Sequence, residues 1–314
     1  MTDTTDNDTS GAKEPKQGLH PRNRFRTRYD FAQLTKACPA LAAFVSPNAH
    51  GDDSIDYANP AAVLALNQAL LKQAYGLQHW EVPPGHLCPP IPGRSDYIHH
   101  LADLLSTGSA PPKGRSVRIL DIGTGANCIY PIIGASEYGW RFVGTETDPT
   151  ACRWARKLVV SNKGLSPLIE VRTQTSLNEC FKGVVKPGEV FAASMCNPPF
   201  HSSAAEAAAS SQRKVHHLSG KKPLEPALNF GGKNGELWCE GGELGFVRRM
   251  IAQSAEIPGT CRWFTSLVSK SAHLQPLQRY LRQAGAAEVK VIDMAQGQKK
   301  SRVLAWTFLT HAEG

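Results

Sequence analysis

The stretch Val117-Arg118-Ile119-Leu120-Asp121-Ile122-Gly123-Thr124-Gly125 decides the fold. The mostly apolar run over residues 117–122 is typical of a buried strand, and the glycines after it let the chain turn into a helix that we expect to reach about residue 138. A glycine pair after a strand is a weak signal by itself, because an ordinary tight turn has the same pattern. The pattern of the following segments therefore has to identify the sheet.

Strands and helices alternate along the rest of the chain. Strands are expected at residues 141–145, 168–172, 190–196, 261–268, 287–292 and 303–309, with helices at 148–162, 242–256 and 273–284. This alternation is typical of a mainly parallel, doubly wound sheet. The short connection between the last two strands predicts an antiparallel hairpin at the sheet edge. The expected fold class is α/β, with a Rossmann-like sheet of seven strands.

An acidic residue, Glu146, ends the second expected strand. Glycines let the backbone approach a ligand closely, and an acid at this place can accept both hydroxyls of a ribose. The third glycine of a dinucleotide fingerprint is missing, because Cys128 takes its position. This favours S-adenosylmethionine, which has a ribose but no phosphate, over a pyrophosphate cofactor, with a purely structural turn as the alternative. The residues expected to bind the cofactor are Asp121, Gly123, Gly125 and Glu146, where Asp121 orients the loop or meets the methionine amine.

Asn197-Pro198-Pro199-Phe200 follows the fourth expected strand. The prolines end the strand, since neither can donate to a sheet ladder. The Asn197 side chain and the next carbonyl can accept the hydrogens of a planar amine, and Phe200 can cover its ring. The tetrapeptide resembles the signature of methyltransferases that act on amino nitrogens, and this resemblance implies that Asn197, Pro198, Pro199 and Phe200 are catalytic, with a plain proline turn as the alternative. The carboxyl ends of parallel strands share one sheet edge, so this corner and the glycine loop should meet there.

The chain before the sheet divides into three parts. Residues 1–16 are polar and are expected to form a disordered tail. Residues 17–114 are expected to form a basic, mostly helical RNA-binding extension, with helices at about 30–43, 60–76 and 95–105, and residues 115–314 the methyltransferase domain. The extension opens with a dense positive stretch that can bind phosphates. The predicted RNA contacts are Arg22, Arg24, Arg26 and Arg28, together with Lys270, Lys299, Lys300 and Arg302 near the ends of late strands.

Composition sets wider limits on the protein. A chain of 314 residues with 41% hydrophobic content can form one large domain with an extension. The excess of 35 Lys+Arg over 27 Asp+Glu suggests a polyanionic partner. The eight cysteines contain no C-x-x-C pair and no zinc-ligand spacing with histidine, so we expect reduced thiols and no metal. The N-terminus shows no apolar signal core and no run is long enough to span a membrane, so we expect a cytoplasmic protein without membrane contact. No extended apolar surface stripe is evident, so we expect a monomer, and we expect no DNA partner.

Five stretches are together more specific than any single motif. They are His20-Pro21-Arg22-Asn23-Arg24-Phe25, Leu87-Cys88-Pro89-Pro90-Ile91-Pro92-Gly93-Arg94, Asp121-Ile122-Gly123-Thr124-Gly125-Ala126, Cys196-Asn197-Pro198-Pro199-Phe200 and Glu240-Gly241-Gly242-Glu243. In these stretches the chain resembles the RlmF family, the 23S ribosomal RNA adenine-N6-methyltransferases. The resemblance implies a class I S-adenosylmethionine-dependent methyltransferase. It also implies that Arg94, Gly123, Glu146 and Asn197 line the cofactor pocket, that Arg94 pairs with the carboxylate of the cofactor, and that Asn197 to Phe200 hold the adenine. After the third strand, Gln174 to Ser176 are further candidates.

Two other kinds of function fit the same residues. One is a methyltransferase of another amino group, such as guanine N2 in ribosomal RNA, an adenine in another RNA or in DNA, or a protein glutamine. The other is a non-catalytic RNA-binding or ribosome-assembly factor that keeps the fold. The intact Gly123 loop, Glu146 and Asn197 argue against the second alternative.

Overall fold

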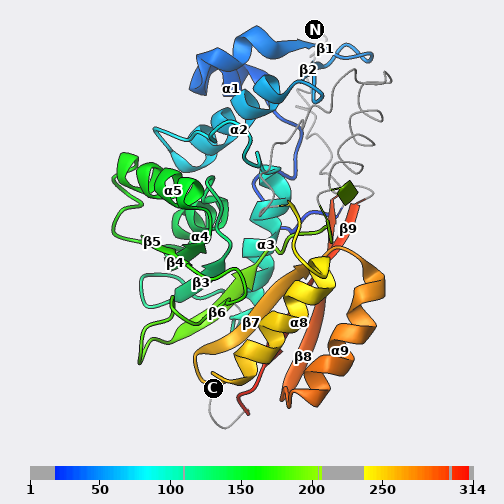
Figure 1. Ribbon diagram of the computed structural model, residues 1–314. Helices are drawn as coiled ribbons and strands as arrows, with labels where there is room; N and C mark the ends of the chain where they lie inside the picture. The colour runs from blue at the N-terminus through cyan, green and yellow to red at the C-terminus, as the bar shows by residue number, and fades with distance from the viewer. Residues whose placement is uncertain (1–17, 109, 204, 207–236, 297–298, 311–314) are drawn as a thin grey trace, which may run out of the picture.

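The computed structural model describes residues 18–108, 110–203, 205–206, 237–296 and 299–310, and Figure 1 shows the arrangement of its helices and strands. The predicted disordered tail, residues 1–16, lies outside the described residues. None of the helices in the described ranges has the length and apolar character needed to cross a membrane.

Seven strands form one sheet, as expected. They are β3 (Arg118–Ile122), β4 (Arg141–Glu146), β5 (Ile169–Thr173), β6 (Phe191–Cys196), β7 (Cys261–Val268), β8 (Glu288–Gln296) and β9 (Lys299–Thr307). The spatial order is β5-β4-β3-β6-β7-β9-β8. The first five strands of this order run parallel, whereas β9 is antiparallel to both β7 and β8. The predicted hairpin is confirmed, and its strand β9 lies inside the sheet between β7 and β8.

Helices cover both faces of this sheet. The helices after residue 115 are α4 (Ile129–Tyr138), α5 (Pro149–Ser161), α8 (Gly242–Ala255) and α9 (Leu274–Gln283), with a short 3-10 turn η2 (Ser271–His273) before α9. Successive residues of a strand point to opposite faces. Accordingly, Ile119 of β3 packs in one apolar cluster with α4 and α5, and its neighbour Leu120 packs in a second cluster with α8 and α9.

The N-terminal extension is mostly helical. It contains α1 (Phe31–Ala37), a 3-10 helix η1 (Pro39–Phe44), a small hairpin of β1 (Val45–Pro47) and β2 (Asp53–Ile55), α2 (Pro60–Tyr75) and α3 (Ile91–Leu104). The start of α2 is as predicted, because the Asn59 side chain accepts hydrogen bonds from the backbone N–H groups of Ala61 and Ala62. The helix ends at Gly76, whose φ of 67° is left-handed.

The expected start of the third helix at about residue 95 is wrong. Helix α3 begins at Ile91, after Pro90, and Ser95 lies inside it, where its Oγ is 3.2 Å from His99 Nε2. Proline is favourable in the first turn of a helix, since the N–H groups there have no intrahelical partner. The helix therefore starts within the proline-rich stretch, and this brings Arg94 into its first turn.

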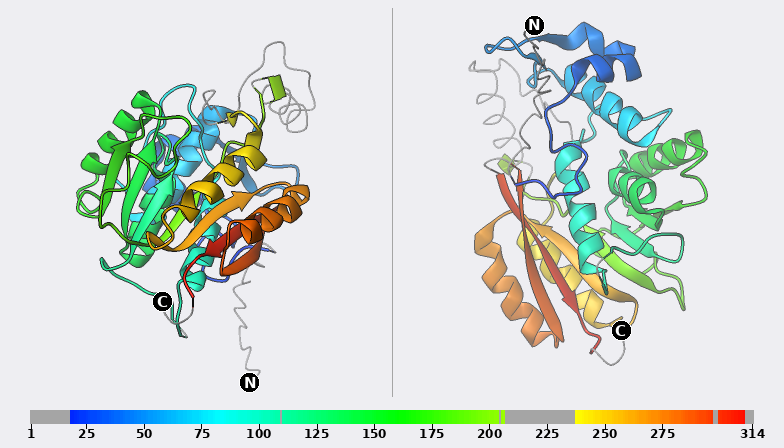
Figure 2. Two further views of the ribbon diagram at one scale, coloured as in Figure 1. Left: turned by 60° about the horizontal axis from the view of Figure 1, so that its bottom comes forward. Right: turned by 180° about the vertical axis from the view of Figure 1, so that it is seen from behind.

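Helix α3 lies across the face of the sheet opposite α8 and α9, as Figures 1 and 2 show from opposite sides. Its residues Ile98 and Leu101 are buried in the same apolar cluster as Ile119 and Ile132 of the sheet domain. The stretch before α1 is anchored as well, because the Asn23 side chain donates a 2.6 Å hydrogen bond to Asp96 of α3. The apolar core thus continues across the sequence boundary at residue 115.

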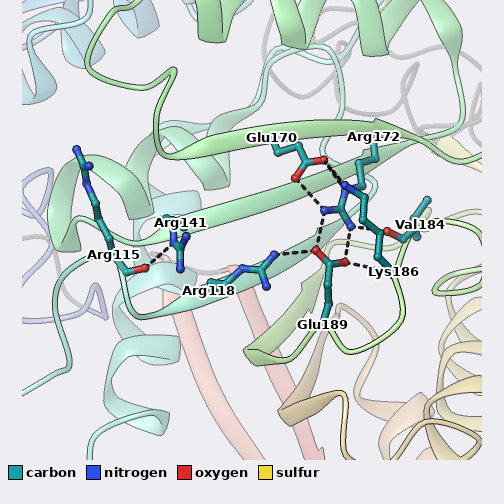
Figure 3. Close-up of polar contacts among 8 residues, drawn as sticks. All are labelled: Arg115, Arg118, Arg141, Glu170, Arg172, Val184, Lys186 and Glu189. Atoms are coloured by element: carbon teal, nitrogen blue, oxygen red, sulfur yellow. Dashed lines mark hydrogen bonds and ion pairs between the residues drawn. The ribbon is translucent and has the colours of Figure 1, made fainter.

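A network of ion pairs joins β3, β5 and the turn before β6 (Figure 3). The Glu189 carboxylate accepts hydrogen bonds from both terminal nitrogens of Arg172, at 2.6 and 2.8 Å, and from Arg118 at 2.9 Å. It also accepts the backbone N–H of Lys186 at 2.8 Å. These hydrogen bonds, those from Arg172 first, hold the pKa of Glu189 well below its usual range. One carboxylate therefore links β3, β5 and the turn before β6.

We expect Glu189→Gln to lower the free energy of unfolding by about 2 kcal/mol at pH 7, because it removes charge-assisted bonds that join three segments. A lowered carboxyl pKa stabilises the fold above the ordinary glutamate pKa, and this contribution declines as the pH falls below it. The difference in the free energy of unfolding between wild type and variant should therefore be smaller at pH 4 than at pH 7. Urea unfolding at both pH values measures this difference.

The matched control is Glu81→Gln, which changes an exposed glutamate for which no ion pair is found among the described residues. It should leave the urea midpoint unchanged at both pH values. If Glu189→Gln were as stable as Glu81→Gln at pH 7, the network would not have the stabilising role given to it here.

Candidate functional site

A pocket of about 900 Å³, including the part open to solvent, lies at the carboxyl ends of β3, β4 and β6. Six of the nine predicted cofactor and corner residues line it, and they come from four segments: Arg94 from α3, Gly123 and Gly125 from the loop after β3, Glu146 from the end of β4, and Asn197 and Pro199 from the residues after β6. Asp121, Pro198 and Phe200 are not among its lining residues. The structure thus brings the glycine loop and the Asn-Pro-Pro-Phe corner to one sheet edge.

The glycine loop is pressed onto strand β4. The backbone N–H groups of Gly123 and Thr124 both donate to the Thr145 carbonyl, at 3.0 and 2.9 Å. Gly144 of β4 permits this approach, since a Cβ at that position would lie 3.0 Å from the Thr124 side chain. Gly123 adopts a left-handed φ of 75°, which glycine reaches without steric cost.

Glu146 is fixed by backbone donors on both sides. Its Oε2 accepts the N–H of Gly125 at 2.9 Å, and its Oε1 accepts the N–H groups of Thr147 and Asp148 at 2.7 and 2.9 Å. The side chain is buried, with 8% of the residue exposed. A carboxylate held in this way keeps one orientation at the pocket wall, as is needed to accept the hydroxyls of a ribose.

Cys128 adopts a left-handed conformation with φ 50°, directly before helix α4. This is the position where a dinucleotide fingerprint has its third glycine, and the turn keeps the glycine-like conformation although the residue has a side chain. The buried thiol lies 3.8 Å from Thr124 Oγ1, and burial raises its pKa to about 12. Cys128 is therefore a neutral thiol that packs under the loop.

Asp121 is buried at the end of β3, with 1% of the residue exposed. Neither carboxylate oxygen has a hydrogen-bond partner in the described part of the chain. Burial, with a smaller contribution from the Glu146 carboxylate, raises the pKa of Asp121 to about 7, while Thr124 and Arg94 oppose the shift. A buried carboxyl without partners costs free energy that a bound cation would offset.

Arg94 reaches the pocket from the first turn of α3. Its Nη1 donates to the Tyr130 hydroxyl at 2.7 Å, and its guanidinium lies 5.4 Å from the centre of the Tyr130 ring. Its Nε is buried and has no hydrogen-bond partner among the described residues. A planar cation with a free donor in a pocket is suited to a carboxylate ligand.

The Asn-Pro-Pro-Phe corner follows β6 directly. Asn197 lines the pocket, and its Oδ1 is buried and makes no hydrogen bond within the described ranges. Pro198 is buried, and Phe200 is half-buried beyond the pocket wall. An amide oxygen without a donor at this place is ready to accept a hydrogen from a planar amine.

Two polar groups without partners among the described residues, together with the oriented Glu146 carboxylate, match the chemistry of S-adenosylmethionine. Arg94 offers a donor for the carboxylate, Asp121 an acceptor for the ammonium group, and Glu146 acceptors for the ribose. Arg94 and Glu146 line the same pocket as Asn197, and Asp121 lies directly before its lining residues Ile122 and Gly123. The residues present therefore fit the expected cofactor.

Several pocket residues were not predicted from the sequence. They are Leu87, Pro89, Ile122, Thr124, Asn127, Ile129, Tyr130, Thr145, Thr147, Leu177, Glu179, Cys180, Cys196 and Phe246. Of the further candidates at 174–176, Gln174 lines the pocket and its Oε1 accepts the N–H of Ser176 at 2.9 Å. Leu177 is 78% exposed at the pocket rim, and a large apolar residue in a loop is a signal that could have marked it.

The arginines of the N-terminal stretch have acidic partners that are distant in sequence. Arg22 pairs with Asp103 at 2.5 Å, Arg24 with Glu137 at 2.7 Å and Arg28 with Asp52 at 2.5 Å. Their local sequence holds no balancing acid, but the fold brings one to each of the three. Arg26 donates to the Pro21 carbonyl. Their contact with RNA stays a prediction.

The predicted cations of the late strands lie at the same sheet edge as the pocket. Lys270 follows the carboxyl end of β7, and Arg302 of β9 is opposite Val268 at that end. Lys270 is 3.5 Å from Glu206, and Arg302 is 3.4 Å from Asp293. Lys299 opens β9 and Lys300 is exposed next to it. The positions suit a polyanion that crosses this edge, and the contacts themselves stay predictions.

Comparison with known sequences finds close relatives over nearly the whole chain. A family described as RNA methyltransferase matches residues 13–310. Ribosomal RNA large subunit methyltransferase F of Yersinia enterocolitica is 55% identical over 299 residues, which cover 94% of this chain and 89% of that protein. The protein of the same name from Serratia proteamaculans is 54% identical over 298 residues, with the same coverage of 94% and 89%.

Solved structures share the fold. The hMettl16 catalytic domain in complex with MAT2A 3'UTR hairpin 1 has a TM-score of 0.79 and 34% identity, and the match covers 94% of this chain and 97% of that one. The N-terminal domain of human METTL16 in complex with SAH has a TM-score of 0.74 and 31% identity, covering 93% and 99%. The seven-stranded sheet with its helical N-terminal part is thus common to these proteins.

We expect Gly144→Val to weaken binding of S-adenosylhomocysteine about tenfold, because a side chain there pushes Thr124 away from β4 and moves the glycine loop. Isothermal titration calorimetry measures the dissociation constant. The matched control is Gly164→Val, since a Cβ at Gly164 meets no atom within 4 Å. Unchanged binding in Gly144→Val would mean that the loop does not depend on this close contact.

Proposed function

The chain belongs to the RNA methyltransferase family, as its resemblance to the RlmF family implies, and from this premise we propose how it acts on RNA. It is an S-adenosylmethionine-dependent enzyme with the class I methyltransferase fold. Its proposed reaction is transfer of a methyl group to the N6 amino group of an adenine in 23S ribosomal RNA. The names of its relatives support large-subunit ribosomal RNA as the substrate. The observation that carries the chemistry is the buried, partnerless Oδ1 of Asn197 at the cofactor pocket.

The cofactor is held by two groups without hydrogen-bond partners among the described residues, on Arg94 and Asp121, and by the Glu146 carboxylate that backbone N–H groups orient. Arg94 Nε donates to the carboxylate, Asp121 accepts from the ammonium group, and Glu146 accepts from the ribose hydroxyls. S-Adenosylmethionine supplies a methyl group on a sulfonium, which is open to attack by a nitrogen lone pair. Asn197 lines the same pocket, so a base that it binds would lie next to the methyl group.

The target adenine is splayed out of its RNA and stacks on Phe200. Its amino group donates hydrogen bonds to Asn197 Oδ1 and to the Pro198 carbonyl. These bonds oppose conjugation of the nitrogen lone pair with the ring and direct it to the methyl carbon. The nitrogen–carbon bond forms as the carbon–sulfur bond breaks, and the amino proton leaves to water. Positioning therefore supplies most of the rate.

The RNA path is proposed to run over the cationic sheet edge. Lys270, Lys300 and Arg302 lie at the edge where β6 ends in the Asn-Pro-Pro-Phe corner. Gly18 at the start of the N-terminal stretch lies at this edge too, since it packs against Ala295 of β8, whereas Arg22 and Arg24 contact Tyr138 and Glu137, near the amino end of β4. Arg22, Arg24 and Arg28 would bind phosphate by exchanging their acidic partners, whereas Arg26 needs to give up only a carbonyl. A monomer acting in the cytoplasm, without contact to DNA or membrane, completes the proposal.

We expect Asn197→Ala to reduce methyl transfer at least about a hundredfold, because the amine loses an acceptor that orients its lone pair, while S-adenosylhomocysteine still binds. The assay follows labelled methyl from S-adenosylmethionine into ribosomal RNA that lacks the modification. Calorimetry gives the cofactor affinity of the same variant. Near-normal turnover in Asn197→Ala would contradict the proposed amine site.

Nucleoside analysis of the labelled RNA identifies the base. Labelled N6-methyladenosine supports the proposed reaction. Labelled N2-methylguanosine would instead assign the enzyme to guanine, and wild-type protein that transfers no label would be a non-catalytic RNA-binding factor.

We expect cofactor binding to depend on pH through Asp121. With a pKa of about 7 in the free protein, the carboxyl is mostly neutral at pH 6 and ionises as the pH rises. An ammonium group prefers the ionised form, so S-adenosylhomocysteine should bind about fivefold to tenfold more tightly at pH 7.5 than at pH 6. Asp121→Asn should bind more weakly and lose this dependence. If the affinity of Asp121→Asn for S-adenosylhomocysteine changed with pH as much as that of wild type, Asp121 would be excluded as the titrating group.

A further inference from the structure

Strands β6 and β7 separate just before the catalytic corner. Their last paired residues are Ser194 and Phe264, although β6 continues to Cys196 and β7 to Val268. On its other side β6 stays paired with β3 up to Cys196. The end of β6 that carries Asn197 therefore needs support from another element on the β7 side.

Tyr97 of helix α3 supplies that support. Its hydroxyl lies 2.7 Å from Thr265 Oγ1 of β7 and accepts the backbone N–H of Cys196 at 3.4 Å. Tyr97 and Thr265 are both fully buried. The Cys196 N–H belongs to the residue directly before Asn197, so the tyrosine hydroxyl reaches the strand end at the place where the amine acceptor begins.

The direction of these hydrogen bonds follows from counting protons. Thr265 has one hydroxyl hydrogen, and it is donated to the Ser194 carbonyl at 2.8 Å. Thr265 Oγ1 can then only accept from Tyr97, and the Tyr97 oxygen keeps its lone pairs for the Cys196 N–H. Burial raises the pKa of Tyr97 well above its ordinary value, so the hydroxyl keeps its proton. The chain of donors from Tyr97 through Thr265 to Ser194 thus has one consistent arrangement.

The same turn of α3 also supports the cofactor end of the pocket. Arg94 and Tyr97 are three residues apart, a spacing that places them on one side of the helix. The Tyr97 ring packs edge to face on Tyr130 at 5.4 Å, and Tyr130 in turn holds Arg94 Nη1. One turn of α3 therefore contacts Tyr130, at the cofactor end of the pocket, and Cys196, which directly precedes Asn197.

We propose that Tyr97 is a positioning residue for methyl transfer, whose hydroxyl holds the end of β6 so that Asn197 presents its Oδ1 to the target amine. This role rests on the proposed function of Asn197. Loss of the hydroxyl would leave the cofactor site intact, because the ring still packs on Tyr130. It would let the strand end shift, and small displacements of reacting groups lower the rate of an in-line transfer.

The experiment compares Tyr97→Phe, Thr265→Val and Thr265→Ser with wild type. For each, kcat is measured at saturating RNA and S-adenosylmethionine, and the dissociation constant of S-adenosylhomocysteine by calorimetry. Tyr97→Phe and Thr265→Val should each lower kcat about tenfold with unchanged cofactor affinity. The double variant should have the same kcat as each single variant, since both substitutions break the same series of hydrogen bonds. Thr265→Ser keeps the hydroxyl and should retain kcat.

Tyr138→Phe is the matched control. It removes a buried tyrosine hydroxyl that bonds Arg22 and His99 and that has no hydrogen bond to β6 among the described residues. It should lose comparable thermal stability and keep its kcat. An equal fall of kcat in Tyr138→Phe would show a general loss of stability and overturn the proposal.

Asn197→Ala separates the two proposals. If Asn197→Ala is inactive while Tyr97→Phe keeps a kcat within twofold of wild type, the positioning role fails and the proposed function stands. If Asn197→Ala turns over normally, the amine site itself is wrong, and the role of Tyr97 falls with it. An inactive Asn197→Ala with a slow Tyr97→Phe supports both.

Discussion

The pocket is organised by one constraint: a polar group that is buried without a hydrogen-bond partner destabilises the fold unless a ligand binds it. Asp121, Arg94 Nε and Asn197 Oδ1 are all withdrawn from water at one sheet edge and bonded to nothing in the described chain. Each would be unfavourable in a fold without a ligand. The chemistry of each group complements one part of a methyl donor or a planar amine. The site is thus recognisable from what its residues lack as much as from what they contact.

Helix α3 makes this arrangement possible. It belongs to the N-terminal extension by sequence, yet it packs on the sheet, carries Arg94 into the pocket and places Tyr97 between β6 and β7. A sheet domain without it would lose a cofactor contact and the support of the strand that ends in Asn197. The extension therefore shares an apolar core with the sheet and supplies part of the pocket lining, in addition to its proposed part in binding RNA.

The fold pairs most of the N-terminal arginines with carboxylates that are distant in the sequence. The N-terminal arginines form a dense positive stretch in the sequence, but Arg22, Arg24 and Arg28 each have a carboxylate partner from another segment. Exposed ion pairs are worth little free energy, so phosphate can compete for such arginines. Their primary visible effect is to fasten the stretch to the surface of the fold. The cations beside the corner, such as exposed Lys300, are placed more directly for the substrate.

The sequence by itself determined the alternation of strands and helices, the glycine loop, Glu146 and the Asn-Pro-Pro-Phe corner, because each depends on neighbouring residues and local backbone chemistry. It also determined that the loop and the corner share an edge, since parallel strands align their carboxyl ends. The resemblance to a family, rather than any pattern, placed Arg94 in the pocket. Only the tertiary structure decided the start of α3, the acidic partners of the arginines and the contact between Tyr97 and Thr265. These contacts join residues far apart in the chain, 168 positions for the last pair, and no local periodicity records which distant side chains a fold will bring together.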